Sequence, residues 1–497
     1  MEILNKTSKE KPRNLWKTFD WDKYQNHVTV SSINSATKSE EIDDRVIYMD
    51  DIEKRKEVYG ICGECNEPGT GENWCQSCNA KRFEENFKNW TSGNKDIDEF
   101  IQHSQLNAVH CTKCLEWIPF EKLQNVTYIT RGGFGKIYSA EWPNGRIVRW
   151  DIENQKWKRG IGRKVALKSL DNSSEISTGF LDEIKSYLQI YIRSVIYCYG
   201  ITQDPNTKVY MMVLHYCKNG NLRNFYLNEY DDNIKLYRLS NIANGLLDIH
   251  NAGKVHKDFH SGNILHGGGM YISDLGMCQP ANNEEKSEKI GVYGVLPYMA
   301  PEVLRGYQYT KAADIYSFGI IMNEYLSEEI PFNDISHDHI LAIKICKGLR
   351  PKISEHIPKF LVDLIMKCWD AKAENRPSAK ELYQILNKWN ETQYDDDEIY
   401  SQMNEYKKIR EKKFKSRSNE NKSESIKTHP QAIYTSRLLS FKNLPEPINS
   451  SDLTSFQVNS DDVPSISTNL ISECLDVQLS ESDLNEIIQE DNLNDET

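Results

Sequence analysis

The sequence predicts an α+β protein built from several parts, and three observations support this. The chain has 497 residues, which is too long for a single hydrophobic core. Its central part contains both a strand-like run, at residues 165–168, and apolar residues at helical spacing, at residues 180–188. Close cysteine pairs precede this part, and polar sequence follows it. The predicted order is a low-order segment at 1–50, a cysteine-rich module at 51–121, a large domain at 122–390 and a charged, mostly disordered tail at 391–497.

Four cysteines of the module follow the pattern C-x2-C-x9-C-x2-C, at Cys62, Cys65, Cys75 and Cys78. A C-x2-C pair can hold one edge of a metal ion from a tight turn, and two pairs complete a tetrahedral shell of four thiolates. The nine residues between the pairs are fewer than in a typical zinc ribbon, so the predicted module is small. We expect a structural Zn²⁺ without catalysis, because four thiolates leave no open position; free thiols or a redox pair are the alternatives.

The cysteine pairs and the distribution of apolar residues indicate the cellular compartment of the protein. A third pair, Cys111 and Cys114, would need His103 or His110 to complete a metal site, and we favour two unligated cysteines. Paired cysteines in a reducing compartment indicate metal binding rather than disulfides. The start of the chain, MEILNK, lacks a signal-peptide core, and no apolar run approaches the length of a membrane helix. We therefore expect an intracellular protein, cytoplasmic or nuclear, without a membrane span.

The central domain carries a motif suited to phosphoryl transfer, VHKDFHSGN at residues 255–263, with Asp274 eleven residues beyond Asn263. Phosphoryl transfer needs a group that orients a hydroxyl and oxygen ligands that hold Mg²⁺. Asp258 suits the first role, and Asn263 and Asp274 suit the second. The pattern resembles the catalytic loop and metal-binding motif of protein kinases, with Lys257 for the usual Arg and Leu275 for the usual Phe. Neither change removes a phosphate or metal ligand.

A glycine-rich segment, ITRGGFGKI at residues 129–137, resembles the loop that covers the ATP phosphates in the same family. Glycines let backbone N–H groups lie close to phosphates without interference from a Cβ atom. Taken alone, the segment could also be an ordinary turn between two strands. The ATP-binding residues implied by the resemblance are Ile129, Thr130 (in place of the first glycine), Gly132, Gly133, Phe134, Gly135 and Ile137.

Further along, the run VALK at residues 165–168 is typical of a strand that ends in Lys168. In the family, this lysine binds the α- and β-phosphates, and a following helix supplies the glutamate that fixes it. Glu183 suits that role better than Asp182, because its spacing to the apolar residues of 180–188 indicates an inward face. An edge-strand lysine and a solvated helix face are the alternatives.

The segment LHYCKNG at residues 214–220 resembles the hinge between the two kinase lobes, where the backbone binds the adenine edge. The implied residues are Leu214, Tyr216 and Cys217, with Leu214 at the position that gates the pocket behind the nucleotide. An insertion at residues 143–163 carries several large apolar side chains and predicts an extra hairpin. No function follows from its sequence.

Three later motifs also match, and they predict structural roles. Ala300-Pro301-Glu302 matches the family's Ala-Pro-Glu, and Asp314 begins the segment DIYSFG that matches a buried helix start. Arg376 is expected to pair with Glu302 and to hold the substrate-side lobe together. The motifs follow one order over residues 122–390, so this part resembles the protein kinase superfamily, and most of all the tyrosine-kinase-like kinases of fungi. The resemblance implies a two-lobed fold, with a small, mainly β N-lobe and a large, mainly α C-lobe, that binds ATP and Mg²⁺.

The resemblance further implies an ATP-dependent protein kinase that transfers the γ-phosphoryl group to protein hydroxyls in intracellular signalling. Tyr298 stands where tyrosine kinases usually carry Trp, which favours Ser/Thr specificity. His260 replaces the Lys of most Ser/Thr kinases and Val295 replaces their Thr, so tyrosine or dual specificity stays open. A pseudokinase or ATP-binding scaffold is the other alternative, although Lys168, Asp258 and Asp274 are all present.

The tail has two features of charge. Residues 407–417 are strongly basic, and we favour a solvated helix extension over a nuclear localisation signal or a nucleic-acid patch. Residues 418–497 have few aromatics and are rich in Ser, Asn, Asp and Glu, a composition that predicts disorder. The expected partners are protein substrates and docking partners of the cysteine module and the acidic tail, and nucleic acid is not expected.

Overall fold

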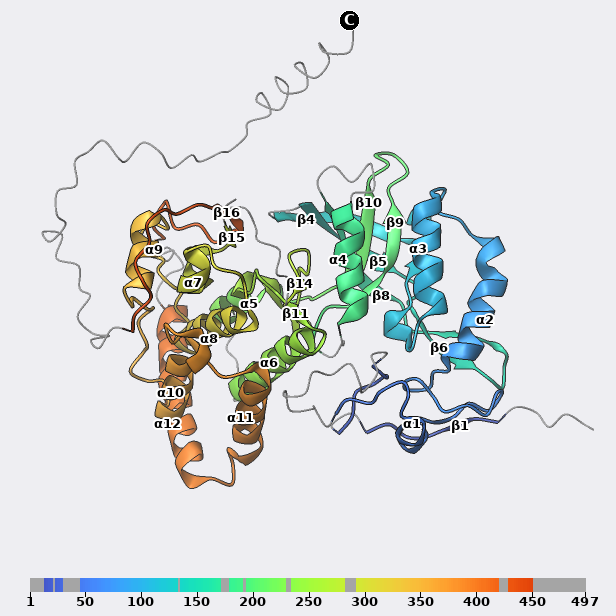
Figure 1. Cartoon of the computed structure of the whole chain (residues 1–497), viewed down its shortest axis with the longest axis horizontal. Helices are drawn as coiled ribbons and strands as arrows, with labels where there is room; N and C mark the ends of the chain where they lie inside the picture. Colours follow the sequence, from blue (N-terminus) through green and yellow to red (C-terminus); the bar gives the residue numbers. More distant parts are fainter. Residues whose placement is uncertain are drawn as a thin grey trace, which may run out of the picture. The chain divides into compact units, whose positions relative to one another are not determined.

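The computed structural model describes residues 13–20, 23–29, 45–132, 135–170, 178–190, 194–228, 234–281, 292–419 and 428–449. The chain divides into two compact units, Met1–Ser450 and Ser451–Thr497, and all the described residues lie in the first. In that unit a mainly β lobe and a mainly α lobe form the predicted two-lobed fold (Figure 1). None of the helices in these ranges has the length and apolar character that crossing a bilayer requires.

The smaller lobe is built on a six-stranded sheet with the order β3-β9-β10-β8-β5-β4. Its strands are β3 (Glu116–Trp117), β9 (Cys198–Gln203), β10 (Tyr210–His215), β8 (Arg163–Leu170), β5 (Gly135–Trp142) and β4 (Gln124–Gly132). Within this sheet β3 and β9 are parallel, and the other neighbouring strands are antiparallel. Because side chains alternate along a strand, Met212 and Leu214 enter the main core with helix α4 (Thr178–Gln189), whereas Met211 and Val213 enter a second core on the other face.

The larger lobe is helical and surrounds one buried helix, α8. Its helices are α5 (Leu222–Asn228), α6 (Lys235–Asn251), α7 (Pro301–Leu304), α8 (Lys311–Ser327), α9 (His339–Cys346), α10 (Lys359–Cys368) and α11 (Ala379–Thr392). Every residue of α8 from Ala313 to Ser327 is buried, as expected for a helix that is apolar on all sides. Two short ribbons carry the catalytic motifs: β11 (Lys254–Val255) with β14 (Gln279–Pro280), and β12 (Ile264–His266) with β13 (Met270–Ile272).

The cysteine-rich segment is joined closely to the smaller lobe. It contains α1 (Ile52–Val58), β2 (Gly60–Ile61), α2 (Gln76–Asn86) and α3 (Lys95–Leu106). Ile97 and Ile101 of α3 lie in the main core, and β3 pairs with β9. Since the end of this segment shares the core of the lobe, it is not an isolated appendage.

The expectation of little order at residues 1–50 is wrong for 13–20, 23–29 and 45–50. Strand β1 (Leu15–Trp16) pairs with β2. Phe19, Val28 and Ile47 form a small core with Val58 and Tyr59 of the cysteine module. These apolar residues are too scattered to show a period, but they become buried because the module offers them partners.

The insertion at residues 143–163 forms the predicted hairpin, with strands β6 (Ile147–Asp151) and β7 (Lys156–Arg159). Its partner is the cysteine module. The ring of Trp157 stacks on Phe83 of α2, with 4.7 Å between ring centroids, and lies 5.9 Å from Trp74. The guanidinium of Arg82 lies 4.2 Å from the ring centroid of Trp150. The hairpin therefore attaches the module to the kinase-like sheet.

Within the tail, which the composition predicts to be mostly disordered, residues 397–419 form a helix. Helix α12 (Asp397–Asn419) follows α11 and includes the predicted helical extension. The hydroxyl of Tyr406 donates to the carbonyl of Leu326 at 2.6 Å, and Arg410 forms an ion pair with Glu328 at 2.5 Å. Glu328 ends α8 in the left-handed conformation. Few apolar side chains suffice here, because each anchor of α12 meets a partner on the lobe.

Residues 428–449 are the second ordered part of the tail. They form an extended segment on the larger lobe, and this segment contains β16 (Arg437–Leu439). Strand β16 pairs with β15 (Val292–Gly294), directly before the Ala-Pro-Glu motif (Figure 1). Leu439 is buried in the main core. Composition alone could not predict this order, since the contacts come from residues distant in sequence.

Candidate active site and cysteine cluster

The buried carboxylate of Asp314 positions the segment that carries the catalytic motif. Asp314 lies in the first turn of α8 and is 0% exposed. Its Oδ2 accepts from the backbone N–H of His256 at 2.8 Å, and its Oδ1 accepts from that of Lys257 at 3.2 Å. Lys257 has a positive φ of 69°, an unfavourable conformation for a side-chain-bearing residue, which these bonds support. The predicted structural residue Asp314 therefore fixes the turn directly before Asp258.

Asp258 and Asn263 face each other across the catalytic loop. The Asn263 amide donates to the carbonyl of Asp258 at 2.9 Å and to its Oδ2 at 3.2 Å. Asp258 is only 5% exposed, and its other oxygen, Oδ1, has no hydrogen-bond partner among the described residues. Burial tends to raise the pKa of Asp258, but hydrogen bonding to His260 and Ser436 lowers it to about 2. The carboxylate is thus ionised and available as an acceptor at neutral pH.

A second set of bonds brings Asp274 beside this loop. The carbonyl of Asn263 accepts from the backbone N–H of Ser273 at 2.8 Å and from its hydroxyl at 2.9 Å. His256 Nε2 lies 3.1 Å from the Ser273 carbonyl. Asp274 itself has a positive φ of 61°, and the following Leu275 is fully buried in the main core. The predicted metal ligands Asn263 and Asp274 are therefore held on adjacent segments.

Lys168 is the point at which the two lobes meet. Its ammonium nitrogen lies 2.8 Å from Glu183 Oε1 on α4 and 2.9 Å from Asp274 Oδ1. Burial tends to lower the pKa of Lys168, but the two carboxylates, Asp274 and then Glu183, raise it overall, so the side chain is charged. Asp182, the rejected alternative to Glu183, pairs with Lys185 on the exposed face of α4.

The residues predicted to bind ATP lie on the strands around Lys168. Ile137 of β5 pairs with Lys168 of β8, and Gly132 pairs with Gly135 at the tip of the glycine-rich hairpin. Ile129 and Thr130 lie on the exposed strand β4. Leu214 and Cys217 are buried and Tyr216 is partly buried at the connection between the lobes. Gly133 and Phe134 lie outside the described residues.

Glu302 and Arg376 form a two-point ion pair in the larger lobe. Nη1 of Arg376 lies 2.6 Å from Oε1 of Glu302, and Nη2 lies 2.8 Å from Oε2. The same guanidinium donates to the carbonyls of Ala312 and Asp370. Because each of the three guanidinium nitrogens donates a hydrogen bond, the pair fixes the start of α7 against α8. This arrangement is the one that the sequence motifs predict.

Sequence reasoning missed a buried network that links the catalytic loop to the substrate-side loop. Its centre is Glu324 in α8, which is 0% exposed. Tyr298 donates to Glu324 Oε2 at 2.6 Å, and Ser261 donates to Oε1 at 2.9 Å. Arg223 donates to Glu324 Oε1 at 3.1 Å and to the Tyr298 hydroxyl at 2.7 Å. A glutamate within an apolar helix was the available signal, because a buried charge requires partners.

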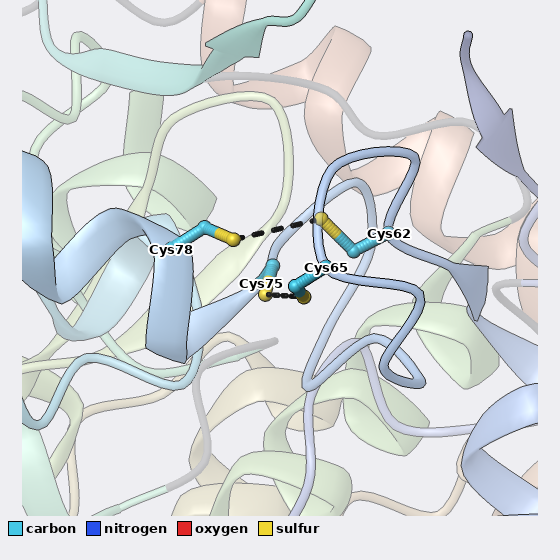
Figure 2. Close-up of side chains that lie close together, drawn as sticks. All are labelled: Cys62, Cys65, Cys75 and Cys78. Carbon is cyan, nitrogen blue, oxygen red and sulfur yellow. Dashed lines mark hydrogen bonds between the residues drawn. The ribbon is translucent and has the colours of Figure 1, made fainter. Parts of the chain in front are cut away.

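The four cysteines of the C-x2-C pairs meet at one point. Their sulfur atoms all lie within 4.8 Å of one another. Figure 2 shows Cys62 facing Cys78, with 3.9 Å between sulfurs, and Cys65 facing Cys75, with 3.6 Å. Tetrahedral Zn²⁺ with Zn–S bonds of about 2.3 Å separates its sulfurs by about 3.8 Å. Donor set and spacing therefore fit a Zn²⁺ ion.

Local structure explains why the sulfurs converge. Cys62 begins a turn that Asn66 closes, with a backbone bond from its N–H to the Cys62 carbonyl and a positive φ of 63°. Cys75 is the N-cap of α2 and Cys78 lies in its first turn. The N-terminal end of a helix favours negative charge, so it suits thiolates.

Cys111 and Cys114 take no part in this cluster. Both are buried, and within the described ranges neither belongs to a group of three or more residues that could hold a metal. Cys111 Sγ lies 3.7 Å from His110 Nε2, and the Cys114 thiol points to the carbonyl of Leu115. Burial raises the pKa of both thiols, which favours the neutral form. Both side chains pack in a small apolar core with Trp74 and Phe83.

Comparisons with known proteins identify a family for the central domain. Residues 123–386, just over half of the chain, match the family model described as protein tyrosine and serine/threonine kinase. Two proteins of Dictyostelium discoideum, each named a probable serine/threonine-protein kinase, are 28% and 27% identical over 60% and 54% of this chain. A protein kinase and PP2C-like domain-containing protein of Arabidopsis thaliana is 30% identical over 36% of it. The matches cover only 21%, 28% and 32% of these relatives' lengths.

Proposed function

Because the chain belongs to the protein tyrosine and serine/threonine kinase family, we propose that it is an active, Mg²⁺- and ATP-dependent kinase that phosphorylates serine or threonine side chains of proteins. The observation that carries the proposal is the junction at Lys168. One ammonium lies within 2.9 Å of both Glu183 and Asp274, so the charges that the chemistry requires are assembled across the two lobes.

Each residue has a distinct role in the proposed reaction. Lys168 binds phosphate oxygens of the nucleotide, and Glu183 holds its ammonium in place. Asn263 and Asp274 are the oxygen donors that would hold Mg²⁺, which when bound neutralises charge on the phosphates. Asp258, ionised and nearly buried, accepts a hydrogen bond from the substrate hydroxyl and orients it toward the γ-phosphoryl group.

The contacts around Asp258 favour a short alcohol side chain over a phenol. The hydroxyl of Ser436, which belongs to the chain's own tail, lies 2.5 Å from Asp258 Oδ2. Ser436 directly precedes Arg437, the first residue of β16, which pairs with Gly294 of β15. A tyrosine hydroxyl lies several ångströms farther from its backbone, so a tyrosine with its backbone at this position would place its hydroxyl beyond the carboxylate.

The cysteine cluster is proposed to hold one structural Zn²⁺ through Cys62, Cys65, Cys75 and Cys78. Four thiolates saturate the ion, so its role is to stabilise the module. Reduced thiols suit the cytoplasm or the nucleus, where the enzyme would act on protein substrates. The module and the acidic tail are the proposed docking regions for partners.

Phosphoamino acid analysis tests the proposed function. Purified full-length protein is incubated with Mg²⁺ and radiolabelled ATP on a peptide array containing Ser, Thr and Tyr acceptors. We expect phosphoserine and phosphothreonine that depend on Lys168, with Lys168→Met as the inactive control. ATP binding without any transfer would favour the alternative of a pseudokinase, and phosphotyrosine alone would overturn the assigned specificity.

A further inference from the structure

The hydroxyl of Ser436 occupies the position that a phosphoacceptor takes beside the catalytic carboxylate. Ser436 Oγ donates to Asp258 Oδ2 at 2.5 Å and lies 3.5 Å from His260 Nε2. His260 Nδ1 accepts from the backbone N–H of Gly262 at 3.1 Å, which leaves Nε2 to carry a proton toward Ser436 and Asp258. Asp258 is only 5% exposed, so few groups can reach it.

The backbone of the tail is held as a bound peptide would be. Strand β16 adds to β15 in antiparallel register, with Arg437 opposite Gly294, Leu438 opposite Tyr293 and Leu439 opposite Val292. Strand β15 belongs to the loop between Asp274 and Glu302, which is the substrate-side loop of the proposed kinase. Addition of an extended peptide to a strand edge is a common mode of peptide recognition, in which alternate side chains enter pockets. Leu439 is buried, whereas Leu438 is exposed.

Residues before Ser436 are anchored on the segment around His337. His337 makes two hydrogen-bonding contacts with the tail. Its backbone N–H donates to the carbonyl of Gln431 at 3.0 Å, and its ring Nδ1 lies 2.9 Å from the carbonyl oxygen of Ile433. The ring of Tyr434 meets His337 edge-on, and its hydroxyl donates to the Pro331 carbonyl at 2.8 Å.

The same anchor reaches the buried network of the active site. The guanidinium of Arg223 lies 4.3 Å from the ring centroid of Tyr434, and it also donates to Tyr298 and Glu324. After Ser436, Arg437 donates to the His337 carbonyl at 2.7 Å. The tail therefore contacts residues that support the catalytic loop, rather than a remote surface.

Residues after β16 extend the contact over the larger lobe. Phe441 stacks on His339, and Glu446 forms a two-point ion pair with Arg305. The backbone N–H of Ile448 donates to the carbonyl of Cys346 at 3.0 Å. Contacts on both sides of Ser436 fix its register, so a shift by one residue would break several of them.

We propose that residues 428–449 are an intramolecular substrate that competes with protein substrates for the site formed by Asp258 and β15, and that Ser436 is a hydroxyl that the kinase phosphorylates in its own chain. The proposal rests on the proposed function. In the reaction, the Oγ–H bond of Ser436 and the bond from the γ-phosphorus to its bridging oxygen in ATP break. A bond from Oγ to the γ-phosphorus forms, the proton passes by way of Asp258 to solvent, and ADP leaves.

Phosphorylation of Ser436 would also free the site formed by Asp258 and β15. A phosphoserine carries about −1.5 to −2 charges at neutral pH. At Ser436 a charged phosphate would replace a hydroxyl that lies 2.5 Å from the buried carboxyl group of Asp258, where neither space nor solvent is available for it. The modified segment is therefore expected to leave the site formed by Asp258 and β15, which then becomes accessible to protein substrates.

The test uses dephosphorylated full-length protein, Mg²⁺-ATP and mass spectrometry. Ser436 is expected to be phosphorylated at a rate that does not depend on protein concentration, because the acceptor belongs to the same chain. Thr435→Ala and Ser440→Ala are matched controls, since both hydroxyls are exposed neighbours, and they should leave that rate unchanged. A rate proportional to protein concentration, or no modification of Ser436 in an enzyme that phosphorylates peptides, would overturn the proposal.

Release variants test the competition separately. Leu439→Asp removes the buried anchor of β16, and Tyr434→Ala removes the other anchor if the first variant fails to fold. Either, combined with Ser436→Ala so that this position cannot be phosphorylated during the assay, should lower the KM for a serine peptide by at least about tenfold relative to Ser436→Ala alone, because an attached competitor has a high effective concentration. An unchanged KM would overturn the competition. Absence of transfer to any hydroxyl, in the wild type and both release variants alike, would instead contradict the proposed kinase activity.

Discussion

Lys168 on β8 and Glu183 on α4 form a buried ion pair, with 2.8 Å between the ammonium nitrogen and the carboxylate Oε1. The hydroxyl of Tyr187, one turn further along α4, lies 3.3 Å from the same oxygen. Asp274 of the larger lobe completes the junction. The position of α4 is thereby coupled to the charge that binds phosphate, so a change at Glu183 acts on catalysis through Lys168.

Replacing Glu183 by Gln should therefore lower kcat/KM for ATP by about 100-fold, because Lys168 loses the anion that positions it. Initial-rate kinetics against ATP measure the effect, and thermal unfolding shows whether the fold is retained. Asp182→Asn is the matched control on the neighbouring position, since Asp182 pairs only with the exposed Lys185 in the described structure. Equal losses in the two variants would contradict the role assigned to Glu183.

The cysteine cluster should bind one Zn²⁺ per chain. Cys75→Ser removes one of four ligands and should abolish stoichiometric zinc and make residues 55–90 sensitive to protease, since metal binding and local folding are linked. Elemental analysis of reduced full-length protein measures the metal. Cys111→Ser serves as the control, because Cys111 lies outside the cluster.

Zinc stoichiometry in the wild type and in Cys111→Ser shows which cysteines are ligands. Wild type with clearly less than one Zn²⁺ per chain after chelator-free purification would contradict the site. A second equivalent that Cys111→Ser removes would show that Cys111 and Cys114 are ligands, against the present assignment. ATP binding should persist in Cys75→Ser, because the nucleotide residues lie on the sheet and hinge.

The hairpin β6–β7 should stabilise the attachment of the cysteine module. Trp157→Ala removes ring contacts to Phe83, Trp74 and Trp150 and should reduce the free energy of unfolding by about 2 kcal/mol. Denaturant titration measures the change. Ile161→Ala in the same insertion should have little effect, because Ile161 is 90% exposed. A loss of similar size at Ile161 would contradict the docking role of the hairpin.

Activity should depend weakly on phosphorylation of the loop that contains Ser287, a residue outside the described ranges. The residue before the catalytic Asp is Lys257, which cannot bind a phosphate through two points as a guanidinium can. Its ammonium instead donates to Gln279 at 2.9 Å. Ser287→Ala should keep kcat within about twofold of wild type. A large loss in a peptide assay would contradict this prediction.

The sequence predicted the residues of the junction because their chemistry fixes both type and spacing. Lys168, Asp258, Asn263 and Asp274 each stand at the position that the family motif requires. The pairing of Glu302 with Arg376 could be predicted for the same reason. The partners of Glu324 could not, because Arg223 and Tyr298 lie far from it along the chain and only the fold brings them together.

The tail shows the opposite limit of sequence reasoning. Its average composition predicts disorder, since few apolar side chains are available to offset the entropy of ordering. Tyr434 and Leu439 lie in short apolar groups, residues 432–434 and 438–439, within polar sequence, and their contacts with the larger lobe order them. No local period reveals such anchors. The cysteine module is intermediate: the metal ligands follow from spacing, whereas its attachment to the insertion hairpin does not.

Steady-state phosphorylation of a serine peptide by wild type and Asp274→Asn, after preincubation with Mg²⁺-ATP, is the most direct test of whether the chain is an active, Mg²⁺-dependent protein kinase. Neutralising Asp274 removes a proposed metal ligand and one of the two carboxylates beside Lys168. We predict phosphoserine in the wild-type reaction and a kcat that is lower by about 1000-fold in the variant, with retained folding. Near-wild-type turnover of Asp274→Asn in Mg²⁺ would contradict this prediction.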